Sequence, residues 1–348
     1  MKALTVLPLT AGSARLDDID EPPVADGPVL VETLAVGVCG TDIEITSGAY
    51  GWPPPGRERL VLGHESLGRV LEAPAGASVA AGDLVVGIVR RPDPVPCGNC
   101  AVGEWDFCRN GQYTERGIKQ RDGYCSERYR IEPDFLIKID PALGRCGVLL
   151  EPTSVVAKAW EQVDRIGGRA HWAPTTAVIT GAGPIGLLAA LIGVQRGMEV
   201  HVLDQVTSGL KPDLVAALGA TYHTGKVEDI GIAPDVVIEC TGVSSLVFDA
   251  MEHLGPNGVL CLTGVSSGGR SIDVDAGLLN RSLVLSNEAI VGSVNANRRH
   301  YEAAAAALAN ADHGWLERVI SRTVPLANFA DALVRQPDDV KVVIEINT

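Results

Sequence analysis

The feature that most constrains this chain is a glycine-rich turn between a buried strand and a helix. The stretch 176–183 (TAVITGAG) begins as an apolar strand, and 184–197 (PIGLLAALIGVQRG) continues as a helix with apolar residues at helical spacing. The glycines of such a turn let the backbone bend tightly and approach a pyrophosphate closely, and the helix N-terminus offers free N–H groups to the phosphates. We therefore predict a dinucleotide site here, against the alternative of a glycine-rich turn without a ligand. The residues assigned to this site are Gly181, Gly183, Pro184, Ile185 and Gly186.

Strand-like and helix-like segments alternate after this turn. Strands alternating with helices predict a parallel sheet with helices on both faces. Six strands of this kind complete a dinucleotide-binding fold, so we assign the α/β class with a doubly wound Rossmann sheet. The further strands are expected at 199–204, 235–242, 258–265 and 288–295, and the further helices at 211–219 and 245–255.

Asp204 closes the second strand of this series, about twenty residues after the glycines, where the dinucleotide fingerprint has an acidic residue. A carboxylate at this point accepts hydrogen bonds from the ribose hydroxyls and repels a 2′-phosphate, which favours NAD over NADP. Lys211 follows closely enough to leave NADP open, and an exposed acidic strand end is the other interpretation. Thr241, at the end of the strand 235–242, is a further expected cofactor contact.

The first 150 residues have a different pattern of secondary-structure signals. They contain short β-type runs at 29–38, 66–73 and 82–89, separated by stretches rich in turn-forming residues, which favours an irregular, mostly antiparallel β domain. An Ala-rich helix at 300–310 and a final strand near 341–347 are extra to a six-strand nucleotide sheet. We therefore expect the chain to return to its first domain. The predicted domains are a mostly β catalytic domain of residues 1–174 plus 297–348, and an inserted Rossmann domain of residues 175–296.

Composition excludes several classes of partner. The 43 acidic and 29 basic residues give a net charge of −14, which argues against nucleic acid and anionic membranes. No run of apolar residues is long enough to span a bilayer, and the N-terminus does not resemble a secretory signal, so we expect a cytoplasmic protein. In that setting the clustered members of the eight cysteines are candidate metal ligands. The other four, Cys125, Cys146, Cys240 and Cys261, have no ligand-like spacing.

Two glycine-flanked motifs carry chemistry suited to zinc. Residues 37–42 (GVCGTD) contain Cys39, and residues 63–68 (GHESLG) contain His64 followed by Glu65. Thiolate, imidazole and carboxylate form a sensible mixed ligand set for a catalytic zinc, which keeps one position open for water or substrate. Taken singly, Cys39 or His64 is more often a packing residue than a ligand.

These motifs, together with LEPTSV (150–155) and GAGPIG (181–186) in this order, resemble the zinc-containing medium-chain alcohol dehydrogenase family over essentially the whole chain. The resemblance implies Cys39 and His64 as catalytic zinc ligands, with Glu65 and Glu151 as alternating or additional carboxylates. It implies Thr41 as the hydroxyl that relays the substrate proton. It also implies a GroES-like fold for the first domain and assembly into homodimers or homotetramers.

The same resemblance implies a structural zinc in a lobe around residues 93–108. Cys97, Cys100 and Cys108 match the last three of the family's four cysteines. Pro94 occupies the nominal place of the first, and Asp93 beside it offers a carboxylate oxygen as a fourth ligand. The alternative is a vestigial lobe that holds no metal.

Within the family, the chain resembles the archaeal-type glucose dehydrogenases. The segments that carry the likeness are LVLGHE (60–65), VRRP (89–92), DFC with ERGI (106–118), the Asp-Gly-Tyr stretch 122–124 and GSVN (292–295). The likeness implies that Glu115 contacts sugar hydroxyls and that Asn295 reaches both nicotinamide and sugar. It also implies that Glu151 faces the substrate. Glu115 as a solvated loop carboxylate and Asn295 as a helix cap are the competing interpretations. Val89 stands where some of these enzymes have a sugar-binding Asn.

The expected activity is therefore oxidation of the C1 hydroxyl of an aldose to the aldonolactone, with hydride transfer to NAD(P). A zinc dehydrogenase of polyols, amino sugars or secondary alcohols shares every metal and cofactor residue and is the first alternative. A catalytically silent nucleotide-binding relative is the second. It is disfavoured because Cys39, His64, Glu65 and Glu151 are retained together.

Overall fold

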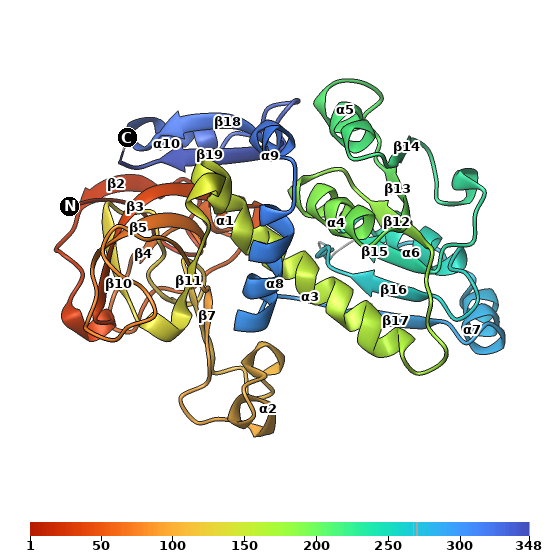
Figure 1. Ribbon diagram of the computed structural model, residues 1–348, viewed down its shortest axis with the longest axis horizontal. Helices are drawn as coiled ribbons and strands as arrows, with labels where there is room; N and C mark the ends of the chain where they lie inside the picture. The colour runs from red at the N-terminus through yellow and green to blue at the C-terminus, as the bar shows by residue number, and fades with distance from the viewer. Residues whose placement is uncertain (267, 269–270, 348) are drawn as a thin grey trace. The chain divides into compact units, whose positions relative to one another are not determined.

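The computed structural model describes residues 1–266, 268 and 271–347, and it contains two compact units (Figure 1). The first unit comprises Met1–Glu151 with Ala296–Thr348, and the second comprises Pro152–Asn295. The second unit is thus an insertion within the first, as the sequence predicts. Over the described residues, no helix combines the length and the apolar character needed to cross a membrane.

The first unit is built on mainly antiparallel sheets, in which β18 and β19 form one parallel pair and β8 and β9 another. Its central strand, β3, has buried and less buried residues in near alternation, because one face of the strand packs on the core. The largest sheet has the order β11-β6-β5-β3-β19-β18, with β10 also paired to β3. Smaller sheets have the orders β2-β1-β4 and β7-β8-β9. The strands are β1 (Lys2–Val6), β2 (Arg15–Asp18), β3 (Val29–Val38), β4 (Leu60–Val61), β5 (Glu65–Glu72), β6 (Leu84–Gly87), β7 (Arg90–Arg91), β8 (Thr114–Arg116), β9 (Gln120–Arg121), β10 (Arg128–Ile131), β11 (Leu136–Lys138), β18 (Ile320–Pro325) and β19 (Lys341–Glu345).

The chain's return after the insertion supplies β18 and β19 to this sheet. β19 pairs antiparallel with β3, with Val342 opposite Val38 and Val343 opposite Gly37. The predicted final strand is therefore confirmed, and it lies beside the strand that leads to Cys39. The helices of this unit are α1 (Gly40–Thr46), α2 (Gly98–Ala101), α8 (Arg298–Ala309), α9 (His313–Val319) and α10 (Phe329–Ala332).

The second unit is the predicted parallel sheet. Its strand order is β14-β13-β12-β15-β16-β17, all parallel neighbours, which is the doubly wound order in which the chain reverses direction at its first strand. The core of this unit includes Val178, Val237 and Leu260. The fold class is confirmed. The elements are β12 (Thr176–Thr180), α4 (Pro184–Gln195), β13 (Glu199–Leu203), α5 (Leu210–Ala217), β14 (Thr221–His223), β15 (Val236–Glu239), α6 (Ser244–Glu252), β16 (Val259–Leu262), α7 (Ala276–Leu285) and β17 (Ala289–Gly292).

One long helix, α3 (Leu150–Gly167), explains where the units divide. Residues 152–174 were grouped with the first domain by sequence, but α3 packs in the second unit from Pro152 onward. The Trp160 indole N–H donates to the Ala189 carbonyl at 3.2 Å, and its ring lies against Gly193 of α4. The chain therefore passes from one compact unit to the other at 151/152 and at 295/296. The functional domain boundaries given above stay a prediction.

Candidate active site

Cys39 is the last residue before α1 and acts as its N-cap. The Asp42 carboxylate accepts a hydrogen bond from the Cys39 backbone N–H at 2.9 Å, which fixes the turn that follows β3. Because Cys39 stands where a strand becomes a helix, its thiol is held on a rigid junction between two ordered elements. Thr41 lies within the first turn of α1 and is partly buried. No described contact tests its role as proton relay, which stays a prediction.

His64 and Glu65 stand at the start of β5, beside the end of β3. Gly37 on β3 is paired with Glu65, and a Cβ at Gly37 would lie only 2.0 Å from Glu65 Oε2. The preceding residue, Gly63, has φ of +89°. Glycine at both positions therefore lets the His64–Glu65 pair lie directly against β3.

The structure brings the predicted cluster together. One ligand atom each of Cys39, His64 and Glu65 lies within 4.8 Å of the other two. His64 Nδ1 is 3.5 Å from Asp42 Oδ1, and neither atom has a hydrogen-bond partner of good geometry among the described residues. A carboxylate behind one imidazole nitrogen, with the other nitrogen left for a metal, is the usual arrangement around a zinc-binding histidine.

The electrostatics of this cluster suit a cation. Although complete burial of His64 opposes protonation, the Asp42 carboxylate and the Cys39 thiol raise the pKa of His64 well above its usual value. The groups that favour a positive charge on this imidazole also favour a metal dication at the same place. The residues present therefore fit a zinc ion.

Glu65 has a second partner that the sequence did not reveal. Lys341 Nζ, on β19, donates to Glu65 Oε1 at 2.7 Å and Oε2 at 2.6 Å, and both side chains are almost completely buried. The third donor of Lys341 reaches the Val38 carbonyl at 3.2 Å. The Glu65 carboxylate is therefore held by an ammonium group at the edge of the cluster, and its role as a direct ligand stays a prediction.

Glu151 lies in the first turn of α3 and is buried. Burial and the neighbouring Glu65 carboxylate together raise the pKa of Glu151 to about 7, although His64 and Lys341 oppose the change. Glu151 is therefore within electrostatic reach of the cluster, but it is not one of the three residues whose ligand atoms converge. Its ligand role also stays a prediction.

The lobe around α2 brings its three cysteines together. Ligand atoms of Cys97, Cys100 and Cys108 lie within 4.8 Å of one another, and the Cys97 and Cys100 sulfurs are 3.6 Å apart. Thiolates about 2.3 Å from a tetrahedral zinc are separated by roughly 3.8 Å, so this spacing fits a zinc. The Cys108 sulfur is 3.9 Å from Asp93 Oδ2, which places Asp93 beside the three thiols. N–H donors from Arg109 and Cys100 lower the pKa of Cys97 to about 6, which favours the thiolate.

Glu115 is buried on β8 rather than solvated. Its Oε1 accepts from Arg90 Nη2 at 2.9 Å and from Arg90 Nε at 3.1 Å. The turn that follows Glu115 packs against the metal motif, because Gly117 has φ of +71° and a Cβ there would lie 2.5 Å from the Gly63 carbonyl oxygen. Gly63 directly precedes His64, so Glu115 and the cluster lie near each other within one unit.

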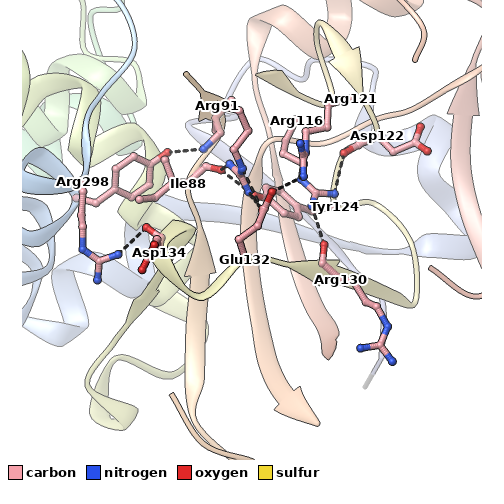
Figure 2. A network of polar contacts seen from close by, with 12 residues as sticks. Ile88, Arg91, Arg116, Arg121, Asp122, Tyr124, Arg130, Glu132, Asp134 and Arg298 are labelled. Carbon is pink, nitrogen blue, oxygen red and sulfur yellow. Dashed lines mark hydrogen bonds and ion pairs between the residues drawn. The ribbon is translucent and has the colours of Figure 1, made fainter. Parts of the chain in front are cut away.

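A network of arginines holds the backbone around this strand (Figure 2). Arg116 is fully buried, and its guanidinium donates to the Asp122 and Arg130 carbonyls at 3.2 and 2.6 Å. Glu132 accepts from Arg91 at 3.0 Å. Since these bonds run mainly to backbone oxygens, they stiffen the support beneath Glu115 rather than supply reactive groups.

In the second unit, the glycine-rich turn has the geometry that a dinucleotide needs. Gly181 has φ of +91°, and a Cβ at Gly186 would lie 1.7 Å from the Gly181 carbonyl oxygen. The space at Gly183 is open, with no atom within 4 Å of the Cβ position. Gly183 is the N-cap of α4, and Pro184 and Ile185 begin the helix. The turn therefore presents free N–H groups where phosphates bind.

Asp204 stands at the end of β13 and is tied to this turn. Its Oδ2 accepts from the Ala182 N–H at 2.7 Å and from Lys211 Nζ at 3.0 Å, and its Oδ1 accepts from the Val206 N–H at 3.1 Å. Although partial burial opposes ionisation, these donors lower the pKa of Asp204 below its usual value. The carboxylate is ionised, and a lysine ammonium lies beside it.

The remaining predicted contacts lie in the same unit. Thr241 packs its methyl group against the Gly181 position and donates from its backbone N–H to Glu239 at 2.7 Å. Asn295 has a left-handed φ of +60°, and it is not the cap of the following helix. Asn297 is the N-cap of α8, so that alternative for Asn295 is wrong. The functional roles of Thr241 and Asn295 stay predictions.

Comparison with known proteins agrees with this arrangement. Residues 25–141 match the family model described as the alcohol dehydrogenase GroES-like domain, and residues 144–346 match the glucose dehydrogenase C-terminus. A glucose 1-dehydrogenase of Methanocella arvoryzae is 41% identical, with 99% of each chain covered. The chain belongs to the zinc-dependent medium-chain dehydrogenases, within the glucose dehydrogenases.

Two further members of the family are also similar. A glucose 1-dehydrogenase of Halobacterium salinarum is 37% identical, with 96% of each chain covered. A solved structure of Haloferax mediterranei glucose dehydrogenase, described as a complex with NADP, Zn and gluconolactone, has a TM-score of 0.92 at 33% identity, covering 100% of both chains. These similarities confirm the predicted family and fold over the full length of the chain.

As a medium-chain dehydrogenase, the chain contains site residues that sequence reasoning missed. Asp42, Arg90 and Lys341 each contact a predicted site residue, but none was assigned a role. One signal was present for Lys341, since this lysine directly precedes the apolar residues VVI of β19, and a lysine buried there is unusual unless it is paired. Nothing in the spacing of Arg90 relative to Glu115 indicated that the two would pair across β7 and β8.

Proposed function

We propose that this chain is a zinc-dependent dehydrogenase that oxidises the C1 hydroxyl of an aldose to the aldonolactone and passes the hydride to a nicotinamide dinucleotide. The observation that carries the proposal is the convergence of Cys39, His64 and Glu65 at the junction of β3, α1 and β5. It is supported by full-length relatives named glucose 1-dehydrogenase, and by the Haloferax structure with zinc and gluconolactone.

The zinc would be held by Cys39 and His64, with protein coordination completed by Glu65, Glu151 or both in exchange. When bound, it supplies Lewis-acid polarisation of a hydroxyl oxygen. Asp42 orients the His64 ring from behind, and Lys341 balances the charge of Glu65. The protein part of the site is therefore preorganised by buried polar contacts before any substrate binds.

The substrate would be positioned by the chain's own polar groups. Thr41 follows Cys39 by two residues and would pass the hydroxyl proton outward. Glu115, oriented by Arg90, would accept hydrogen bonds from further sugar hydroxyls, as a polyhydroxylated ligand requires. We also propose that Asn295 contributes to both nicotinamide and sugar binding.

For the cofactor, the pyrophosphate would lie on the turn Gly181–Gly186 at the N-terminus of α4. We propose that NAD is favoured over NADP because the ionised Asp204 carboxylate repels a 2′-phosphate. The Haloferax relative was solved with NADP. Here Lys211, 3.0 Å from Asp204, offers a cation that lets NADP bind as a second cofactor.

The lobe would hold a structural zinc through Asp93, Cys97, Cys100 and Cys108. Its ligands come from one short segment and close around the ion, so the lobe stabilises structure and takes no part in turnover. We also propose a cytoplasmic homodimer or homotetramer with the domain boundaries 174/175 and 296/297.

A substrate panel tests this function. Purified protein is assayed with glucose, galactose, xylose, sorbitol and a simple secondary alcohol, each with NAD and with NADP. The proposal requires reduction of the cofactor with aldoses and formation of the lactone. Turnover confined to sorbitol or the simple alcohol would instead support the polyol or secondary-alcohol dehydrogenase alternative.

A further inference from the structure

Two aromatic side chains stand on the surface just after α1. Tyr50 is 38% exposed and Trp52 is 41% exposed, whereas Trp105, Trp160 and Trp315 are all buried. The rings of Tyr50 and Trp52 meet edge to face, with centroids 4.9 Å apart and planes at 75°. Edge-to-face contact fixes one ring by the other and leaves ring surface open to solvent.

The backbone of Trp52 is fixed to the turn that follows Glu115. The Trp52 N–H donates to the Ile118 carbonyl at 2.9 Å, and the Gln120 N–H donates to the Trp52 carbonyl at 3.0 Å. These two bonds form a parallel bridge between Trp52 and Lys119. The aromatic pair is therefore attached to the same turn whose Gly117 packs on Gly63, beside the metal cluster.

The same turn joins the aromatic pair to Glu115: the Ile118 N–H donates to the Glu115 carbonyl at 3.2 Å, and the Ile118 carbonyl accepts from the Trp52 N–H. Burial raises the pKa of the Tyr50 hydroxyl, and the charge of Glu115 raises it further. Arg90, which binds Glu115, lies 3.8 Å over the ring of Tyr113. One patch of the first unit thus combines exposed aromatic rings with a buried carboxylate–guanidinium pair.

This combination matches the chemistry of a sugar ring. A pyranose has an apolar face of C–H bonds and a rim of hydroxyls, so it is recognised by an aromatic ring against its face and by charged groups at its rim. Resting on the proposed function, we propose that Trp52, held by Tyr50, is the platform for the pyranose ring, and that it selects cyclic aldoses over simple alcohols. An alcohol without such a ring gains little from the platform.

The test compares Trp52→Ala and Trp52→Phe with the wild-type protein on glucose. Trp52→Ala should raise KM by about three- to tenfold, the ratio that one aromatic contact supplies, and change kcat by less than about twofold. Trp52→Phe should restore most of the loss because it keeps a ring. Val24→Ala, an exposed site elsewhere in the unit, should leave both constants unchanged.

A second measurement reports binding without turnover. Of the five tryptophans, Trp52 is exposed, Trp172 is half-buried, and Trp105, Trp160 and Trp315 are buried. Glucose should therefore change the wild-type fluorescence emission through Trp52, and Trp52→Ala should abolish the change. Light scattering on both proteins checks whether this patch is instead a contact between subunits.

The outcomes separate the two proposals. If the wild-type protein oxidises no aldose with either cofactor, the proposed function and the platform both fail. If it oxidises glucose and Trp52→Ala leaves KM and the fluorescence response unchanged, the platform alone is overturned. A change of oligomeric state in Trp52→Ala with unchanged KM also overturns it, in favour of a subunit contact.

Discussion

At the scale of single residues, the metal cluster depends on small differences in side-chain size as much as on its ligands. Because Gly37 has no side chain, the Glu65 carboxylate can lie directly against it. Because Gly117 has none, the turn after β8 can pack directly on Gly63. Any larger residue at either position meets a neighbouring atom at 2.5 Å or less. Glycines therefore allow the close packing around Cys39 and His64, at Gly37 on β3 and at Gly117 in the turn after β8. The spacing of the motifs did not predict this requirement.

His64→Ala and Cys39→Ala should each remove one zinc ion per chain while leaving cofactor binding nearly unchanged. Each substitution deletes a ligand from a cluster that offers few others, whereas the glycine-rich turn lies in the other unit. Metal analysis and dinucleotide titration measure the two effects. Cys146→Ala, a buried thiol outside both clusters, is the control and should keep its full zinc content. A full zinc content in His64→Ala would refute the ligand assignment.

Lys211→Ala should weaken NADP binding more than NAD binding. Removing the ammonium leaves Asp204 without its ion pair and deprives a 2′-phosphate of its partner, so we expect a loss of roughly five- to twentyfold for NADP. Asp204→Ala should have the opposite effect and weaken NAD binding more than NADP binding. The dissociation constants of NAD and NADP, measured by titration for each variant, check both expectations. Equal effects of Lys211→Ala on the two cofactors would contradict this account of cofactor choice.

Lys341→Met should destabilise the fold because it leaves the buried Glu65 carboxylate without its cation. Breaking a buried ion pair from one side costs about 3–5 kcal/mol. The double substitution Lys341→Met with Glu65→Gln should recover part of that loss, since no uncompensated charge remains. Denaturant unfolding measures these free energies. Lys138→Met, which breaks an exposed pair with Asp83, should cost much less.

At the scale of secondary-structure elements, the sequence predicts best where the hydrophobic period is strong. The strand at 29–38 and the strand–turn–helix from Thr176 onward are confirmed nearly to the residue. The nucleotide sheet needed six strands, but the pattern located only five of them. The missing one is β14 (Thr221–His223), an edge strand of three residues that is too short and too polar to show a period.

The pairing of β18 with β19 has its own electrostatic anchor. Asp339, just before β19, accepts from Arg322 Nη2 at 2.6 Å and from the Gln336 N–H at 2.8 Å. The Arg322 side chain lowers the pKa of Asp339 below its usual value. The contribution of Asp339 to stability is therefore complete above the unfolded-state pKa, near pH 4, and is lost as the pH falls through the lowered value.

Asp339→Asn should lower the free energy of unfolding by about 1–3 kcal/mol at pH 7, because Arg322 loses its ionised partner. The same variant should show a shallower loss of stability below about pH 4, since the titrating group is gone. Denaturant unfolding across pH 2–7 checks both statements. Asp338→Asn, which changes the exposed neighbour, should match the wild-type protein. If Asp339→Asn lost stability below about pH 4 as steeply as the wild-type protein, the role given to Asp339 would be refuted.

At the scale of the whole molecule, the insertion of one unit within the other follows from the order of elements. The predicted strand near the C-terminus was not needed to complete a six-strand nucleotide sheet. In the structure this strand, β19, pairs with β3 of the first unit. What the sequence could not supply is the set of contacts made by that return, above all Lys341 against Glu65. Such contacts join residues 276 positions apart in the chain, so no local pattern predicts them.

The most direct measurement is glucose oxidation by the purified protein before and after removal of its zinc. The account predicts glucose-dependent reduction of the nicotinamide cofactor that disappears when zinc is removed by chelation. It also predicts that added zinc restores the activity in the wild-type protein but not in Cys39→Ala. Glucose oxidation that survives complete removal of zinc, or that Cys39→Ala retains, would contradict it.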